Sequence, residues 1–209
     1  MSKKPGKPNK LLVLSADGLV KEDVDTLRSM PNFRKYFARA SGVERVRSVY
    51  PTITYPCHTT MCTGVWPEKH GVCGNYQLRP GKKEKPWKWF RTDNHWPDDI
   101  FYAAKRMGLS TGAVFWPVTG NHPAIDYLID EYWPQFKDDP LPDVFRRSGS
   151  SEEVLRAIGH SYQDVHLRIH PESSEFIIRC AVDLIDTFQP DVLFLHPADI
   201  DAARHRYGV

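Results

Sequence analysis

The stretch Leu11-Leu-Val-Leu-Ser-Ala-Asp17-Gly18 decides the fold, because it joins a continuous apolar run to an acidic turn. Leu11 to Ser15 predict a short strand that is buried on both faces, as in a parallel sheet. Such a strand delivers Asp17 to the carboxyl end of the sheet, where open α/β folds gather their functional groups. Asp17 is therefore a candidate site residue, although an acid before glycine is also common in turns that have no catalytic role.

Strand-like and helical segments alternate along the rest of the chain. Helical spacing covers 20–29, 31–40, 99–107, 150–158 and 172–188, and 54–63 is a candidate turn into a short helix. Further strands are expected at 43–50, 111–116 and 191–195. This alternation predicts an α/β fold with a mostly parallel central sheet and helices on both faces. We expect a flexible tail over 1–10, one domain over 11–209, a surface excursion at 76–96, and a loop at 117–142 with one short apolar segment at 125–129.

Composition excludes several classes of protein. With 41% hydrophobic and 26% charged residues among 209, the chain is typical of a soluble globular protein rather than a disordered one. The net charge of +2 provides no general basic surface, so no stable nucleic-acid binding is expected. We find no signal peptide or membrane-spanning run and expect a cytoplasmic location with no membrane segment. The four cysteines lack a C-x-x-C spacing and are expected to be reduced thiols.

A second group of polar residues follows the last predicted strand. Asp201 and His205 are four residues apart, so on a helix they would face the same side and could share one metal ion. Asp199 would point elsewhere. Carboxylates and an imidazole that converge from separate strand ends suit zinc or manganese. By itself the pair is weak evidence, because a helix-start acid and a solvated histidine give the same pattern.

Thr54 is a candidate nucleophile at the start of the predicted helix over 54–63. Its hydroxyl could simply cap a helix that begins near Pro56. A hydroxyl at a helix N-terminus can also lie beside a bound phosphate, because the helix dipole and free amides favour negative charge there. Coordination to a metal would activate the hydroxyl further.

Three motifs resemble those of the nucleotide pyrophosphatase/phosphodiesterase family in the alkaline phosphatase superfamily. The longest is Tyr50-Pro-Thr-Ile-Thr54-Tyr-Pro-Cys-His58, which continues through His70-Gly-Val-Cys-Gly-Asn75 and resembles the nucleophile region. Leu14-Ser-Ala-Asp17-Gly18 resembles the first metal motif. Asp201-Ala-Ala-Arg-His205-Arg-Tyr-Gly208 resembles D-x-x-G-H-x-Y-G, with Arg204 where glycine is usual, and Val114-Phe-Trp-Pro117 also has a counterpart. The resemblance spans Leu11 to Val209 and implies an alkaline-phosphatase-like fold.

The resemblance also implies an activity. The family suggests a metal-dependent hydrolase that cleaves phosphodiester or nucleotide pyrophosphate bonds through a phospho-threonine intermediate. Thr54 would be the nucleophile, with Thr52 as the neighbouring alternative. Asn75 would donate its amide to a phosphate oxygen, and Tyr55 would flank the leaving group or a nucleobase. The expected substrate is a nucleotide or another small phosphodiester.

The implied cofactors are two divalent metal ions, with zinc favoured. Asp17 and Thr54 would bind one ion, and Asp201 and His205 the other. The family carries a further Asp-His pair and a last histidine downstream, whereas this chain stops at Val209. We therefore expect an N-terminal portion of a longer enzyme, a fold that is incomplete at its C-terminus, and weak zinc binding with little activity by this chain.

Two alternatives remain open, and several residues are given no role. The alternatives are a phosphomonoesterase or phosphonate hydrolase that uses the same site, and a non-catalytic, metal-deficient binding protein. The basic run at 82–85, with Trp87 and Trp89, is interpreted as a solvated loop. The remaining histidines lack partners at ligand spacing and are expected to be surface or structural residues: His95, His122, His160, His166, His170 and His196.

Overall fold

Four parallel strands form the central sheet of the computed structural model. The structure describes residues 10–43, 45–77, 80–81, 87, 90–93, 98–136, 138–162, 165–166 and 169–208. The strands are β1 (Leu11–Leu14), β2 (Thr111–Val114), β3 (Tyr127–Ile129) and β4 (Val192–Leu195), in the order β1-β4-β2-β3. All three strand pairings are parallel, which confirms the predicted α/β class. Residues 1–9 of the predicted tail over 1–10, the basic run at 82–85, Trp89 and His95 lie outside the described residues.

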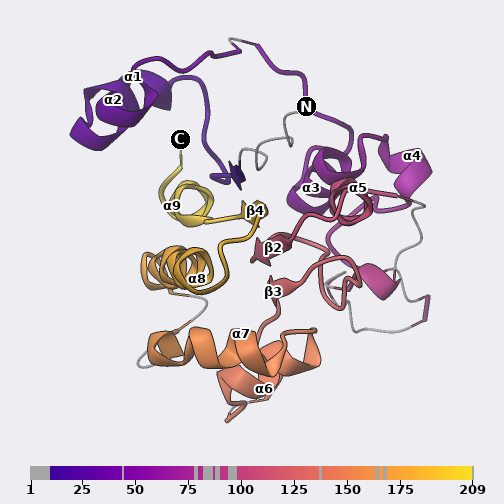
Figure 1. Ribbon diagram of the computed structural model, residues 1–209. Helices are drawn as coiled ribbons and strands as arrows, with labels where there is room; N and C mark the ends of the chain where they lie inside the picture. The colour runs from indigo at the N-terminus through magenta and orange to yellow at the C-terminus, as the bar shows by residue number, and fades with distance from the viewer. Residues whose placement is uncertain are drawn as a thin grey trace, which may run out of the picture.

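Helices cover both faces of the sheet (Figure 1). On one face α6 (Leu141–Arg147), α7 (Glu152–Ala157) and α8 (Glu172–Phe188) enclose an apolar cluster, and on the other α3 (Thr54–Thr63) and α5 (Ile100–Arg106) contribute to a second cluster. Leu193 and Leu195 of β4 belong to the first cluster, whereas Val192 and Phe194 belong to the second. Successive strand side chains point to opposite faces, so a continuous apolar strand supplies both cores.

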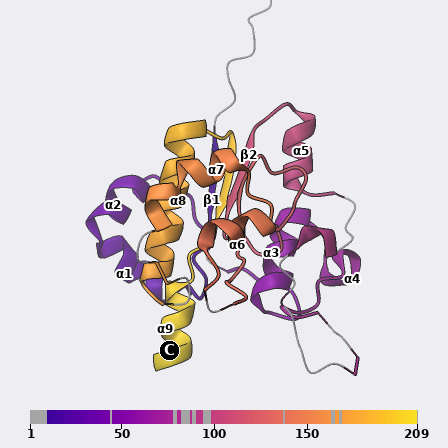
Figure 2. The same cartoon turned by 90° about the horizontal axis from the view of Figure 1, so that it is seen from below.

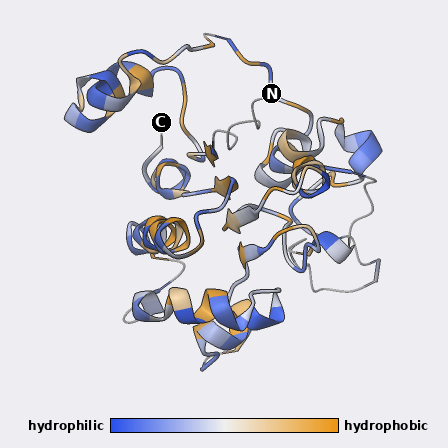
Figure 3. Ribbon diagram, in the orientation of Figure 1, coloured by the Kyte–Doolittle hydropathy of each residue, from blue (hydrophilic) through white to orange (hydrophobic). Residues whose placement is uncertain are grey.

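Aromatic rings fill much of each core. Phe145 and Phe176 stack with ring centroids 5.9 Å apart, and Phe115 meets each of them edge-on at 6.1 Å. On the other face Trp116 packs edge-on against Phe194 at 4.8 Å. In Figure 3 hydrophobic residues gather where α6, α7 and α8 face the strands. Among the described residues, no helix combines the length and the apolarity needed to cross a membrane.

The remaining helices lie around this core. They are α1 (Asp23–Ser29), α2 (Pro31–Phe37), α4 (Pro67–His70) and α9 (Asp199–Tyr207), with short 3₁₀ turns at Arg91–Asp93 and Gly159–Tyr162. Figure 2 shows α8 alongside the sheet and α9 continuing past it towards the C-terminus. Neither α1 nor α2 contains a buried residue, and Arg204 of α9 donates two hydrogen bonds to Asp23 of α1. The four cysteines are free thiols, as expected.

Two expectations for the middle of the chain are wrong. The predicted strand at 43–50 is extended but unpaired in its described residues, with Val43 and Val46 79% and 82% exposed. Alternating residues form a strand only when a neighbouring strand pairs with them, and the pattern does not supply one. Conversely, β3 lies in the apolar segment of the predicted loop over 117–142, and α6 begins at the end of that loop, because a three-residue strand and a seven-residue helix are too short to show a clear period.

A buried carboxylate–imidazole pair holds α5 against the β2–β3 connection. Asp99 Oδ1 accepts hydrogen bonds from the amides of Phe101 and Tyr102 and so caps α5. Its Oδ2 lies 2.7 Å from His122 Nε2, and both side chains are 1% exposed. The Ala124 amide donates to His122 Nδ1, which places the imidazole proton on Nε2, facing Asp99. His122 is therefore a structural residue, as expected.

Replacing Asp99 with alanine should lower the free energy of unfolding by about 3 kcal/mol, since it removes a helix cap and leaves a buried imidazole without its acceptor. Urea unfolding followed by circular dichroism measures the change. Asp98→Ala is the matched control, because Asp98 lies next in sequence and its contacts are an exposed ion pair with Arg106 and a hydrogen bond from the Asp99 amide. Equal effects of the two substitutions would contradict this account of the buried pair.

Candidate active site

The candidate site is a cavity at the carboxyl ends of the strands. Its volume is about 310 Å³. Asp17 follows β1, Glu131 follows β3, Thr54 is the first residue of α3, and Asp201 lies in the first turn of α9. The described lining also includes Tyr55, Asn75, Trp87, Phe115, Trp133, His170, His196 and His205. The structure thus brings all six predicted site residues to one cavity, from three distant parts of the sequence.

A close backbone contact places Asp17 beside Asp201. The amide of Asp201 donates a hydrogen bond of 3.1 Å to the carbonyl of Asp17. Gly18 has φ +74°, and a Cβ atom at this position would lie 2.7 Å from Asp201 Cα and 2.8 Å from Asp201 N. Both the left-handed backbone and the absence of a side chain are needed there. Asp17 also accepts a hydrogen bond from the Gly18 amide, so its turn role and its place in the site coexist.

Thr54 directs its hydroxyl group towards Asp17 rather than capping its helix. Thr54 Oγ1 donates to Asp17 Oδ2 at 3.3 Å, and α3 begins at Thr54 with Ile53 as an N-cap that makes no side-chain hydrogen bond. The helix-cap interpretation of Thr54 is therefore wrong. Thr52 donates its hydroxyl to the carbonyl of Val49 at 2.7 Å and is not among the described lining residues. The geometry thus favours Thr54 over its neighbour.

The start of α3 offers fewer free amides than the sequence suggests. The Tyr55 amide donates to Asn75 Oδ1 at 3.0 Å, and Pro56 has no amide proton. The hydrogen bond to Tyr55 fixes the Asn75 side chain, so that its NH₂ group remains available to the cavity. The anion-binding donors that this geometry supplies are therefore the Thr54 amide and the Asn75 side chain, rather than a full turn of amides.

Asp201 and His205 form the second predicted pair on α9. His205 Nε2 lies 3.4 Å from Asp201 Oδ1, so the expected (i, i+4) proximity is confirmed. The His205 side chain is 81% exposed, whereas Asp201 is half-buried. Burial and the charge of Asp17 raise the pKa of the Asp201 carboxyl. Asp199 points away as predicted, and its Oδ1 lies 2.6 Å from His170 Nδ1.

Two histidines beneath the site were not identified from the sequence. His196 directly follows β4, and its Nε2 lies 3.4 Å from Asp17 Oδ2, close enough for an ion pair but without hydrogen-bond alignment. The sequence signal that could have identified His196 was its position at the end of a predicted strand. His58 packs edge-on against His196 with ring centroids 4.3 Å apart, and its Nδ1 lies 2.7 Å from the Thr54 carbonyl oxygen. Because that carbonyl can only accept, His58 Nδ1 donates and Nε2 accepts from the Ser15 hydroxyl.

The packing of Asp17, His58 and His196 lowers the pKa values of Asp17 and His58. Burial opposes ionisation of Asp17, but its contact with His196 and the nearby imidazoles hold the pKa of its carboxyl below the ordinary value. Burial and the neighbouring His196 lower the pKa of His58 to about 3. Near neutral pH the site therefore contains an ionised Asp17 above a neutral His58.

The donors at the site fit part of the ligand set of two divalent cations. Asp17 Oδ2 and Thr54 Oγ1 lie 3.3 Å apart, and Asp201 Oδ1 and His205 Nε2 lie 3.4 Å apart. Each separation allows the two atoms to share one ion, and carboxylate, hydroxyl and imidazole donors suit zinc. Within the part of the chain that the structure describes, no group of three His, Cys, Asp or Glu side chains is arranged to hold a metal. Each pair is therefore an incomplete site.

The fold and the polar groups at the carboxyl edge of its sheet define a class, that of enzymes built on a mostly parallel α/β sheet with the site beyond the strand ends. The family model of type I phosphodiesterases / nucleotide pyrophosphatases matches residues 11–209. The chain belongs to this hydrolytic family, and the resemblance drawn from its motifs is confirmed.

Individual relatives support the same assignment. Ectonucleotide pyrophosphatase/phosphodiesterase family member 3 of Bos taurus is 29% identical over 209 residues, covering 95% of this chain and 20% of that protein. The solved murine ectonucleotide pyrophosphatase/phosphodiesterase 5, an inactive variant in complex with AMP, shares 20% identity and a TM-score of 0.60 over 96% of this chain and 46% of its own. Phosphonoacetate hydrolase from Sinorhizobium meliloti aligns with a TM-score of 0.66 and 21% identity, over 96% of this chain and 49% of its own. The chain thus spans about half the length of these solved proteins.

Replacing Gly18 with alanine should disrupt the site and lower the free energy of unfolding by about 2 to 4 kcal/mol, because the added Cβ atom would collide with the backbone of Asp201 in a strained conformation. Thermal and urea unfolding measure the loss. Gly42→Ala is the control, since a Cβ atom there would meet nothing within 4 Å. Unchanged stability of Gly18→Ala would contradict the close approach.

The neutral His58 should make the protein sensitive to acid. Its folded pKa of about 3 lies below the unfolded value of 6.5, so the unfolded chain binds more protons as the pH falls below 6.5. Stability is fully present above pH 6.5 and should decrease by up to about 1.4 kcal/mol per pH unit below it. His58→Gln should lose less stability than the wild type between pH 7.5 and 5, as measured by urea unfolding at both values. His160→Gln, at an exposed position, should retain the wild-type pH dependence.

Proposed function

We propose that the protein hydrolyses phosphodiester bonds, including those of nucleotides, by attack of the Thr54 hydroxyl on phosphorus. The observation that carries the proposal is the hydrogen bond from Thr54 Oγ1 to Asp17 Oδ2 inside the cavity. The names of the relatives, which are phosphodiesterases and nucleotide pyrophosphatases, support the reaction class. The AMP bound to the murine neighbour supports a nucleotide as one of the two ester groups.

Residues of this chain supply most of the chemical groups needed for a two-step displacement at phosphorus. Thr54 Oγ1 forms a bond to phosphorus as its proton moves to Asp17, and the bond from phosphorus to the leaving oxygen breaks. The resulting phospho-threonine still carries one ester group. Water then hydrolyses the bond between phosphorus and Thr54 Oγ1 and restores the hydroxyl group. Negative charge that develops on the phosphoryl oxygens is stabilised by the Thr54 amide and the Asn75 NH₂ group. Tyr55 would flank the leaving group or a base from the same helix end.

The two pairs of donor residues support two divalent cations as the cofactors of the proposed reaction. Asp17 and Thr54 would hold one divalent cation, and Asp201 and His205 the other, with zinc favoured by the mixed oxygen and nitrogen donors. When bound, such ions supply positive charge that lowers the pKa of the attacking hydroxyl group and stabilises the leaving oxygen. His196 would orient Asp17, and His58 would hold the Thr54 backbone in place.

A phosphonate hydrolase is the second candidate, supported by the fold shared with phosphonoacetate hydrolase. The same attack of Thr54 on phosphorus would serve a phosphonate, so the two candidates differ in the leaving group. Comparing hydrolysis of a nitrophenyl phosphate diester with release of phosphate from phosphonoacetate by the same preparation separates them.

Replacing Thr54 with alanine should reduce hydrolysis of bis(4-nitrophenyl) phosphate by at least about 10³-fold in zinc-containing buffer, because the attacking oxygen is removed. Thr52→Ala is the control and should retain the wild-type rate to within about threefold, because its hydroxyl group donates to the Val49 carbonyl and does not line the described cavity. Mass spectrometry of quenched reactions should find the phosphoryl adduct in the wild type and not in Thr54→Ala. An unchanged rate in Thr54→Ala would exclude this threonine from the mechanism.

A further inference from the structure

His170 lines the candidate site, although it was expected to be a surface or structural residue. It lies two residues before α8, and its side chain is 28% exposed. Its Nδ1 atom lies 2.6 Å from Oδ1 of Asp199, the first residue of α9. Asp199 itself is not among the described lining residues. The imidazole of this pair thus reaches the cavity, and the carboxylate supports it from outside.

The hydrogen bond with Asp199 determines which imidazole nitrogen can exchange a proton with a ligand. A carboxylate oxygen accepts, so His170 Nδ1 donates and keeps its proton whether the ring is neutral or charged. Nε2 is then the atom that gains or loses a proton. An imidazole that a carboxylate holds at one nitrogen is an arrangement suited to proton transfer at the other nitrogen.

Thr54 and His170 reach the cavity from opposite faces of the sheet. Thr54 begins α3, which packs with α5 on one face, whereas His170 precedes α8, which covers the other face (Figure 1). In an in-line displacement the attacking and leaving oxygens lie on opposite sides of phosphorus. A phosphoryl group attacked by Thr54 would therefore direct its leaving oxygen towards the side of the cavity that His170 lines.

We propose that His170 is a catalytic residue that transfers protons to and from the oxygen opposite Thr54, with Asp199 as its positioning residue. The inference rests on the proposed function, in which Thr54 attacks phosphorus. In the first step Nε2 donates its proton to the leaving oxygen as the bond from phosphorus to that oxygen breaks. In the second step the now neutral Nε2 accepts a proton from water as the water oxygen bonds to phosphorus. The bond from phosphorus to Thr54 Oγ1 then breaks, and Oγ1 recovers its proton from Asp17.

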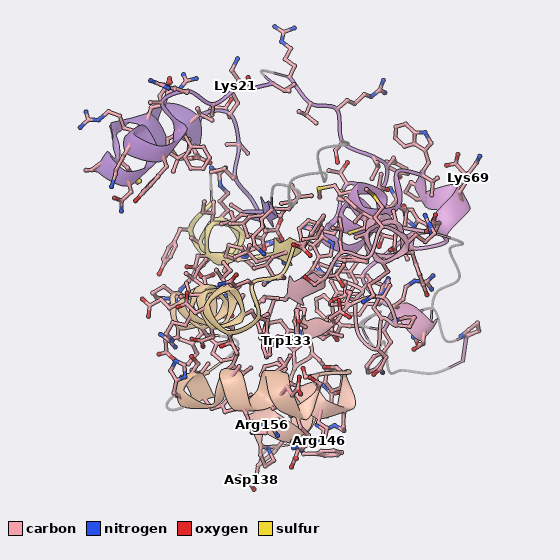
Figure 4. All side chains as sticks on the ribbon, viewed as in Figure 1. Lys21, Lys69, Trp133, Asp138, Arg146 and Arg156 are labelled. Atoms are coloured by element: carbon pink, nitrogen blue, oxygen red, sulfur yellow. The ribbon has the colours of Figure 1, made fainter. Side chains whose placement is uncertain are left out.

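Other groups of the cavity are less suited to this proton transfer. The described lining contains no lysine or arginine, and Figure 4 shows Trp133, a lining residue, within the body of the molecule, whereas the labelled lysines lie at its periphery. The other two histidines of the described lining are paired with carboxylates of the proposed cation sites. Glu131 would become a buried anion near Asp17 on donating a proton, whereas His170 would lose a charge.

His166 provides a matched control on the same segment. Its Nδ1 lies 3.1 Å from Glu172 Oε2, so it forms the same kind of imidazole–carboxylate pair. Its side chain is 67% exposed, however, and it is not among the described lining residues. A general effect of removing such a pair should appear in both His166→Gln and His170→Gln, whereas an effect on phosphoryl transfer should appear only in His170→Gln.

The test compares two diesters that share a methyl group and differ in the leaving group. Methyl 4-nitrophenyl phosphate releases a stable anion, whereas methyl phenyl phosphate releases a more basic one and depends more strongly on a proton donor. In the full chain in zinc-containing buffer, His170→Gln should lower kcat/KM for the phenyl ester by at least about 10²-fold and for the nitrophenyl ester by no more than about threefold. This quantity reports only the steps up to release of the first alcohol. His166→Gln should match the wild type on both esters.

The second step provides a separate readout. Without a base for the attacking water, the methylphospho-threonine formed from the nitrophenyl ester should accumulate in His170→Gln. Mass spectrometry of quenched reactions should find more of this adduct in His170→Gln than in the wild type or His166→Gln. If His170→Gln does not fold, Asp199→Asn takes its place and should lower kcat/KM for the phenyl ester by at least about tenfold, with little effect on the nitrophenyl ester.

Three results would overturn the inference. These are an equal effect of His170→Gln on the two esters, no accumulation of the adduct in that variant, and the same dependence on the leaving group in Glu131→Gln instead. Failure of the proposed function is distinguishable, because the wild type itself would then form no adduct at Thr54 from either ester.

Discussion

The hydrogen bond between the Asp201 amide and the Asp17 carbonyl is the contact on which the site depends. It joins the turn after β1 to the first turn of α9, which are adjacent in space because β1 and β4 pair in the sheet. The approach is so close that only glycine fits at position 18. Two carboxylates from opposite ends of the chain are thereby held at one edge of the sheet, where their mutual repulsion favours a bound cation.

A layer of buried polar groups below this contact holds Thr54, the proposed nucleophile, in place. His58 is anchored at one nitrogen by the Thr54 carbonyl and at the other by Ser15, next to the turn that carries Asp17. Asn75 reaches the same helix end from a separate loop and binds the Tyr55 amide. The first turn of α3 is thus fixed from two sides, so Thr54 needs little reorganisation to present its hydroxyl group.

The cavity combines a polar and an apolar environment. Asp17, Thr54 and Asp201 make one part polar, whereas Phe115 and Trp133 make another part apolar. The polar part suits a phosphoryl group with its counter-ions, and the apolar part suits an organic ester group.

The sequence by itself determined the α/β class, several local elements and the candidate site residues. The helix at 172–188 was predicted with its observed bounds because its period is long, a short helix was expected within 54–63, and Asp17, Thr54, Asn75 and Asp201 were proposed from motifs. Only the tertiary structure decided that the described residues of 43–50 are unpaired, that His58 contacts Thr54 and His196 contacts Asp17, and that Glu131 lines the same cavity. The physical reason is that strand pairing, burial and the partner of a polar group depend on residues far away in the sequence, whereas helical periodicity and turn chemistry depend on neighbours.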